Sequence, residues 1–231
     1  MSEDDLIEAL RGVTTATVTT ILLKKGLRNV WMRGPMPLHV PDKRIAGRAF
    51  TLRFVPARED LATPESWASP RSTRAAIEEM PEGAIMVADA AGVKHAGIFG
   101  DILCARMAKR GAAGLVTDGV IRDVAGVFAA GLPVWAAGAA APPSVAGLTF
   151  AGWQETVGCG GVAVVPNDIV VADADGAVVI PAALAEEVAR LAPGRERFEA
   201  WVMSEVERGV KLPGLYPPDA ETRARYEASQ K

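Results

Sequence analysis

The chain of 231 residues is 49% hydrophobic and 23% charged, so it can bury a large core and is not generally disordered. Its formal net charge of −3 leaves no excess of Lys and Arg for binding phosphates, and we expect no nucleic-acid partner. Two cysteines, Cys104 and Cys159, exclude a disulfide scaffold and a Cys-based zinc site, and they fit a reducing cytoplasm. The acidic residues after Met1 are opposite in charge to the start of a signal peptide, so we expect a cytoplasmic protein.

Residues 124–154 carry no charge and could span a bilayer by length alone. Three prolines and five glycines interrupt the run, and a helix broken so often would leave backbone groups that lipid cannot satisfy. We therefore expect no membrane association. Short buried strands and loops, some of them facing another subunit, explain the run better.

The secondary-structure signals follow one another in a regular order. A capping box at Ser2 predicts a helix to about Leu10, and Thr14 or Thr15 opens a second helix that stops at Gly26. The further elements, in chain order, are a strand at 46–55, a helix from 69–70 to before 81, a strand at 84–89, a helix at 101–110, a strand at 113–117, short strands at 162–165, 169–172 and 177–180, and helices at 182–191 and 196–208. An extended, frayed tail follows Lys211. The alternation over 84–135 predicts α/β architecture, and without a linker we expect one domain over 1–231.

Polar residues follow two successive strands of this predicted sheet. Gly100 and Asp101 open one helix, Asp118 ends the next strand, and Arg122 and Asp123 lie in the loop after it. In open α/β sheets, ligands bind beyond the carboxyl ends of the strands. The free N–H groups of the helix start can hold a carboxylate, and Arg122 can bind one with two hydrogen bonds. Asp101 and Asp123 offer the oxygen ligands that Mg²⁺ and Mn²⁺ prefer.

Each of these residues also has a structural explanation. Asp101 could be an N-cap, Asp118 a turn residue, and Arg122 with Asp123 a surface ion pair. Their convergence after two strands favours a site but does not define a reaction.

Other chemistry finds little support. The sequence has no Gly-x-Ser-x-Gly elbow and no phosphate-binding glycine loop. His95 fits an ordinary loop histidine, although it could lie near the site, and Cys104 fits a small buried hydrophobe.

At these residues the sequence resembles the RraA-like family. This family contains metal-dependent class II pyruvate aldolases for 4-hydroxy-4-methyl-2-oxoglutarate and 4-carboxy-4-hydroxy-2-oxoadipate, and a regulator of ribonuclease E. The most specific part is the Asp-Gly-x-x-Arg-Asp run of 118–123 after Gly100-Asp101. Weaker matches lie at 15–18, 45–51 and 168–181, so the resemblance covers about residues 12–190. The label demethylmenaquinone methyltransferase, which many members carry, is set aside because no S-adenosylmethionine motif is present.

The resemblance implies a swivelling β/β/α-type α/β fold with N- and C-terminal helical extensions. Its core would span about 12–190, with a C-terminal helix and tail over 191–231. It also implies a homo-oligomer, a trimer or a dimer of trimers, with sites between subunits.

The resemblance further implies roles for individual residues. Arg122 would bind the pyruvoyl carboxylate, Asp123 would ligate a divalent metal, Mg²⁺ or Mn²⁺, and Asp101 would order metal-bound water. The helix start at Gly100, with the amides of Ile102 and Leu103, would hold the substrate carboxylate. A glutamate from a neighbouring subunit would complete the water shell, and Glu199 is the nearest candidate, with Glu196 behind it.

Two positions depart from the aldolase pattern. Gly126 stands where the aldolases carry an acidic residue, and Thr20 stands where the second helix usually has Asp. These departures put the particular aldol substrate in doubt more than the metal and pyruvoyl chemistry.

The resemblance thus implies a divalent-metal lyase for a small 2-oxo acid. It would cleave a 4-hydroxy-2-oxo acid to pyruvate, decarboxylate oxaloacetate, or do both. The alternative is a non-enzymatic, protein-binding regulator of a ribonuclease. The resemblance implies that the regulator branch lacks the Asp after the Arg, so Asp123 favours an enzyme.

Overall fold

The computed structural model describes residues 1–39 and 44–230. Two short helices begin the chain, as predicted: α1 (Glu3–Arg11), capped by Ser2, and α2 (Thr15–Lys24), capped by Thr14. Each cap accepts a hydrogen bond from a first-turn amide, which satisfies a donor that the helix itself leaves free.

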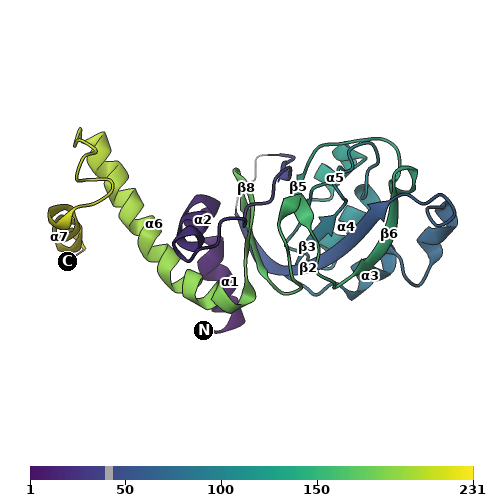
Figure 1. The fold of residues 1–231 in the computed structure, drawn as a ribbon, viewed down its shortest axis with the longest axis horizontal. Helices are drawn as coiled ribbons and strands as arrows, with labels where there is room; N and C mark the ends of the chain where they lie inside the picture. The colour runs from purple at the N-terminus through teal and green to yellow at the C-terminus, as the bar shows by residue number, and fades with distance from the viewer. Residues whose placement is uncertain (40–43, 231) are drawn as a thin grey trace.

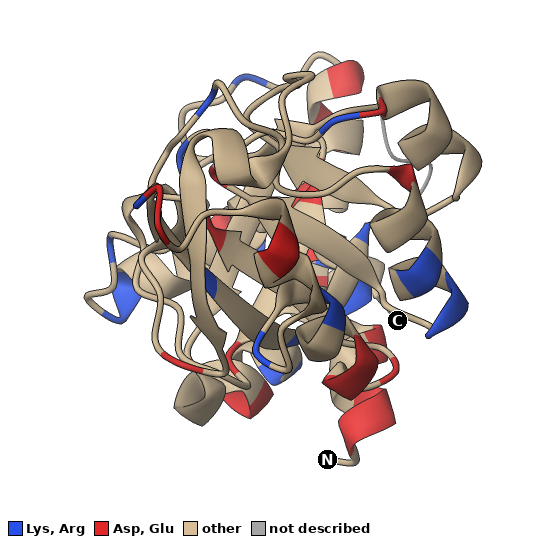
Figure 2. Ribbon diagram, turned by 90° about the vertical axis from the view of Figure 1, so that its right-hand side faces the viewer, with Lys and Arg blue, Asp and Glu red and all other residues tan. Residues whose placement is uncertain are grey.

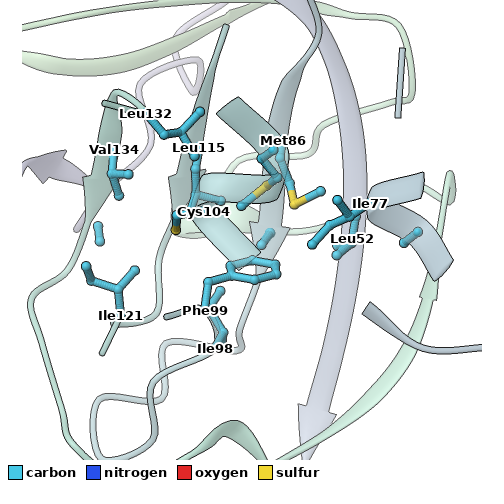
Figure 3. Close-up of a cluster of buried hydrophobic side chains, with 14 of the residues drawn as sticks. Leu52, Ile77, Met86, Ile98, Phe99, Cys104, Leu115, Ile121, Leu132 and Val134 are labelled. Atoms are coloured by element: carbon cyan, nitrogen blue, oxygen red, sulfur yellow. The ribbon is translucent and has the colours of Figure 1, made fainter. Parts of the chain in front are cut away.

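Four parallel strands form the centre of the fold. In sheet order they are β5 (Val134–Ala136), β4 (Gly114–Thr117), β3 (Ile85–Asp89) and β2 (Ile45–Pro56). The helices between them are α3 (Thr73–Glu79), α4 (Asp101–Lys109) and α5 (Val124–Ala129). All three helices contribute to one buried cluster with one face of these strands (Figure 3). Met86 and Ala88 of β3 face this cluster, whereas Ile85 and Val87 lie in a second one. Burial on both faces explains the continuous apolar sequence of β3.

The long strand β2 is shared between two sets of partners. Its first half pairs antiparallel with β7 (Ile169–Asp173), and its second half pairs with β6 (Leu148–Trp153). Beyond β7 lies β8 (Gly176–Ile180), and residues 30–32 bond to β8 just before β1 (Met36–Pro37) pairs with β5. The sheet is therefore nearly closed and barrel-like, which confirms the predicted mixed α/β class.

The C-terminal part differs from the prediction. Instead of two helices at 182–191 and 196–208, one helix, α6 (Ala185–Glu207), runs through Pro193. Its first half is buried against α1 and α2, and this packing compensates for the one hydrogen bond that proline removes.

The expected frayed tail is also wrong, because residues 220–229 form α7 (Ala220–Ser229), capped by Asp219. Tyr226 of α7 packs on Phe198 and Trp201 of α6, with ring centroids 5.1 and 5.4 Å away. In Figure 1, α6 extends away from the sheet and α7 lies at its far end.

Two shorter predictions need correction. Helix α3 starts at Thr73 with Ser72 as its cap, and Ser69 instead ends the 3-10 helix η1 (Pro64–Ala68). Ser72 accepts a hydrogen bond from the Ala75 amide, so it is the residue that satisfies the start of α3. Residues 162–165 form no strand, because glycines at positive φ just before them turn the chain and leave only a single bridge between Val157 and Val164.

In the view of Figure 2, acidic and basic segments are interspersed over the ribbon. In the described part of the chain, no single helix is long and apolar enough to cross a membrane; α1 and α2 reach that criterion only together, across a bend of 109°.

Candidate active site

Two loops meet at the carboxyl ends of β3 and β4, where the sequence places its polar residues. The amide of Ile98 donates to the Val120 carbonyl at 2.9 Å, and the amide of Arg122 donates to the Phe99 carbonyl at 2.9 Å. Ile98 and Phe99 point into the buried cluster and anchor the first loop (Figure 3). The structure therefore brings Gly100-Asp101 beside Arg122-Asp123.

Two glycines make this approach possible. A Cβ at Gly97 would lie 2.9 Å from the Arg122 amide nitrogen and 2.9 Å from the Ala140 carbonyl. A Cβ at Gly100 would lie 2.7 Å from Asp123 Oδ2. Asp123 itself adopts a left-handed conformation (φ 54°, ψ 44°), which aspartate tolerates better than most residues.

The two loops form part of a cavity of about 200 Å³. All six residues predicted for catalysis, substrate and direct metal contact line it: Gly100, Asp101, Ile102, Leu103, Arg122 and Asp123. The rest of its wall comes from Gly97, Ile98, Trp67, Thr73, Arg74, Pro143 and Ser144. Trp67, Thr73 and Arg74 were missed because η1 and α3 lie far away in the sequence and carry no motif.

The arginine and the two carboxylates occupy the cavity wall in a half-exposed state. Arg122 Nε donates to Asp123 Oδ2 at 3.0 Å, with side chains 36% and 44% exposed. The surface ion pair considered from the sequence therefore exists, and the same pair also lines the cavity.

The start of α4 opens onto the same cavity. Gly100, not Asp101, is the N-cap and has no side chain with which to satisfy the first amides. Asp101 Oδ1 accepts a hydrogen bond from the next amide, Ile102, at 2.7 Å. The helix start is thus a favourable place for a carboxylate, with Asp101 competing for one of its donors.

A hydrated divalent cation suits these donors. Mg²⁺ is commonly held by one or two carboxylates plus water and substrate, and Asp101 and Asp123 supply two carboxylates on one cavity. Over residues 1–39 and 44–230, no group of three or more His, Cys, Asp or Glu side chains is arranged around a metal position.

Gly126 is explained by its contact with Asp101. A Cβ at Gly126 would lie 2.5 Å from the Asp101 Cβ, so an acidic side chain does not fit there without a shift of α5. Thr20 bonds within α2 to the Ala16 carbonyl and does not line the cavity.

Asp118 holds neighbouring loops together. It is buried and accepts hydrogen bonds from the Ala90 amide at 2.8 Å and the Gly160 amide at 3.2 Å. Burial raises the pKa of its carboxyl. The turn interpretation is therefore the better one for Asp118.

Neither His95 nor Cys104 belongs to the cavity wall. His95 is exposed and does not line the cavity. Cys104 is fully buried, and burial together with the charge of Asp101 raises the pKa of its thiol to about 12. A thiol with such a pKa is no nucleophile near neutral pH.

The two glutamates suggested from α6 are engaged within their own chain. Glu199 pairs with Arg195 at 2.6 Å and accepts from the Tyr216 hydroxyl at 3.1 Å. Glu196 accepts from the Thr14 amide and hydroxyl at 2.9 and 2.7 Å. Neither lines the cavity of the same chain, and the role of Glu199 in a neighbouring subunit's site stays a prediction.

Comparisons with known proteins agree with this architecture. A protein of Halalkalibacterium halodurans with the provisional name 4-hydroxy-4-methyl-2-oxoglutarate aldolase is 30% identical over 203 residues, covering 84% of this chain and 85% of its own. The solved structure of RraAS2 from Streptomyces coelicolor, described as an unusual member of the RNase ES inhibitor RraA family, is 35% identical with a TM-score of 0.77. It covers 87% of this chain and 96% of that one.

A third similarity concerns the fold alone. An uncharacterized protein of Pseudomonas syringae pv. tomato superposes with a TM-score of 0.78 at 24% identity, covering 92% of this chain and 97% of that one.

The sequence pattern of the RraA-like family, described as Aldolase/RraA, matches residues 14–179. This match spans most of the chain, so the protein belongs to the RraA-like family.

Proposed function

We propose that the protein is a divalent-metal lyase for pyruvoyl acids. It cleaves a 4-hydroxy-2-oxo acid to pyruvate, with oxaloacetate decarboxylation as a companion activity. The observation that carries this proposal is the single cavity onto which Arg122, two carboxylates and the start of α4 all open. The 30% identity with a protein provisionally named as an aldolase supports it.

Arg122 and the start of α4 would hold the substrate carboxylate. A guanidinium offers two parallel N–H donors that match a carboxylate, and the amides at a helix start favour negative charge. Because these groups are already placed by the loops, they orient the scissile bond without further rearrangement.

Asp123 and Asp101 would hold the cation, Asp123 directly and Asp101 through water. Held by these two carboxylates, a divalent cation would supply Lewis acidity at the 2-oxo group of the substrate. A water held by Asp101 would accept the proton of the 4-hydroxyl group.

We further propose that the working form is a homotrimer or a dimer of trimers. Ile102 at the cavity is 78% exposed, and Phe128 of the uncharged run is 46% exposed. A neighbouring subunit covering these side chains would also supply the third acidic group, for which Glu199 is the candidate.

The 35% identity with RraAS2 keeps a second function in view, namely binding and restraining a ribonuclease without catalysis. Such a regulator needs neither a metal nor a free cavity. Metal-dependent pyruvate release therefore separates the two functions.

The test is a coupled pyruvate-release assay on 4-hydroxy-2-oxo acids and oxaloacetate, with and without Mg²⁺ or Mn²⁺. Asp123→Ala should abolish release and weaken Mn²⁺ binding in calorimetry. The control Asp175→Ala removes an exposed carboxylate outside the cavity and should change neither. No metal-dependent release from any substrate, together with tight binding of a ribonuclease, would establish the regulator instead.

A further inference from the structure

The cavity has a second wall that the proposed chemistry does not use. It is formed by η1 and α3, which contribute Trp67, Thr73 and Arg74. The guanidinium carbon of Arg74 lies 5.2 Å from the centroid of the Trp67 ring. Stacking on an aromatic face restrains an otherwise mobile side chain and leaves the guanidinium N–H groups available at the edge.

Arg74 differs from its neighbours in having no carboxylate partner. Arg71 pairs with Glu155 at 3.3 Å, and Arg106 pairs with Glu78 at 2.7 Å. For Arg74, the described residues provide no carboxylate within 4.0 Å. Within the described residues, Arg74 is therefore a cation on the cavity wall that forms no ion pair, whereas Arg122 pairs with Asp123.

The size of the cavity limits what this charge can bind. About 200 Å³ accommodates a small acid rather than a nucleotide or a peptide. Arg122 and Arg74 line the same small space, so a ligand with an anionic group at each end could contact both. A monocarboxylic ligand would leave Arg74 without a partner.

We propose that Arg74 is a specificity-determining residue that binds the distal carboxylate of a dicarboxylic 2-oxo acid, with Trp67 holding it in position. This inference rests on the proposed function, in which Arg122 takes the pyruvoyl carboxylate. It assigns to α3 the discrimination between dicarboxylic and monocarboxylic substrates.

The test compares two ligands that differ only at the distal end. 2-Oxoglutarate and 2-oxopentanoate have the same chain length and lack the 4-hydroxyl group, so binding can be measured by calorimetry with Mg²⁺ and without cleavage. The wild type should bind 2-oxoglutarate on the order of tenfold more tightly, as expected for one charge-assisted hydrogen-bonded contact.

Two variants and a control locate the effect. Arg74→Gln should remove most of the preference and leave the affinity for 2-oxopentanoate unchanged. Arg74→Met keeps a long unbranched side chain at this position but removes the guanidinium, and it should lose the preference to the same extent. Arg71→Gln removes a nearby arginine that lies outside this cavity, and it should keep the wild-type preference.

The possible outcomes distinguish a failure of this inference from a failure of the proposed lyase function. Equal binding of both acids by the wild type, or a preference that persists in Arg74→Gln, would overturn the role of Arg74 and leave the lyase intact. If neither acid binds and no substrate releases pyruvate, the proposed function fails and this inference fails with it.

Discussion

Arg122 is fixed in place by backbone contacts as much as by its own side chain. Its amide bonds to Phe99, and Gly97 and Gly100 let the neighbouring loop lie directly against it. The guanidinium therefore projects from a rigid support, and its shape should matter as well as its charge.

Arg122→Lys tests that point. Lysine keeps the charge but offers a point charge in place of a planar pair of donors, so we expect a loss of about 10²-fold in turnover of oxaloacetate. Metal affinity should stay near the wild-type value. Steady-state kinetics give the turnover number and the potency of oxalate as an inhibitor. Oxalate should lose potency against the variant.

A surface ion pair would behave differently. If Arg122 only pairs with Asp123, lysine should serve nearly as well. Near-wild-type turnover with undiminished oxalate inhibition would therefore show that the site has been placed wrongly.

Gly97→Ala probes the approach of the two loops. Its Cβ would come within 2.9 Å of the Ala140 carbonyl and the Arg122 amide, which are parts of the backbone and cannot easily move. We expect a loss of about 1–3 kcal/mol in the free energy of unfolding. A fall in kcat/KM should accompany it, because Arg122 is displaced.

The matched control is Gly194→Ala in α6. There the nearest atom to the new Cβ is the end of the Arg197 side chain, 3.8 Å away, and alanine favours a helix interior. Denaturant unfolding should show a neutral or stabilised protein. Equal stability and activity of the Gly97 and Gly194 variants would contradict the close-approach argument.

Residues close together in the sequence were the ones that could be predicted for the site. Gly100-Asp101 and Arg122-Asp123 each follow a recognisable strand, and the strand order brings them together. Arg74 and Trp67 could not be found in this way. They reach the cavity from η1 and α3, whose position depends on long-range packing that no local pattern encodes.

At the scale of elements, local chemistry predicted the ends of α1, α2 and α4, because caps and terminal glycines act within one turn. The errors lie where tertiary contacts override local signals. Pro193 lies between the two helices predicted at 182–191 and 196–208, yet α6 continues through it because its apolar face is buried against two other helices. The helix α7 depends on aromatic contacts with α6, which a polar tail sequence does not reveal.

Glu196 connects α6 to the start of α2, and its removal should lower the free energy of unfolding. It accepts two hydrogen bonds from Thr14, so Glu196→Ala should cost about 1–2 kcal/mol at pH 7. The control Glu207→Ala, at the exposed end of the same helix, should stay within about 0.5 kcal/mol of the wild type. Urea unfolding gives both values.

This contribution should depend on pH in a defined direction. Partial burial raises the pKa of Glu196, but the hydrogen bonds from Thr14, together with the nearby Thr17 hydroxyl and the charge of Arg44, outweigh it, and the pKa lies below the ordinary value of 4.5. Stability from this group is therefore fully present above about pH 4.5 and is lost as pH falls through the lowered pKa. The difference between wild type and Glu196→Ala should shrink below pH 4.5, and a difference that grows there would contradict this assignment.

For the whole molecule, the exposed apolar residues predict association. Ile102 lies at the cavity and Phe128 lies in the uncharged run, and both are exposed. An oligomer with closed symmetry would cover both side chains on every copy. Light scattering at micromolar concentration should give the mass of a trimer or hexamer. A stable monomer would remove the proposal that a second subunit completes the site.

The position of β2 in the sheet should make its amide hydrogens exchange slowly with solvent. Residues 49–53 of β2 pair with β3 along one edge, while on the other edge β7 pairs with residues 45–48 and β6 with residues 52–56, so β2 lies inside the sheet and not at its border. Deuterium should enter these amides only when the entire protein unfolds, and their exchange rates should report the global free energy of unfolding. The amides of the short edge strand β1 should exchange much earlier. Mass spectrometry of a peptide from β1 and a peptide from β2 would therefore distinguish local opening at β1 from global unfolding.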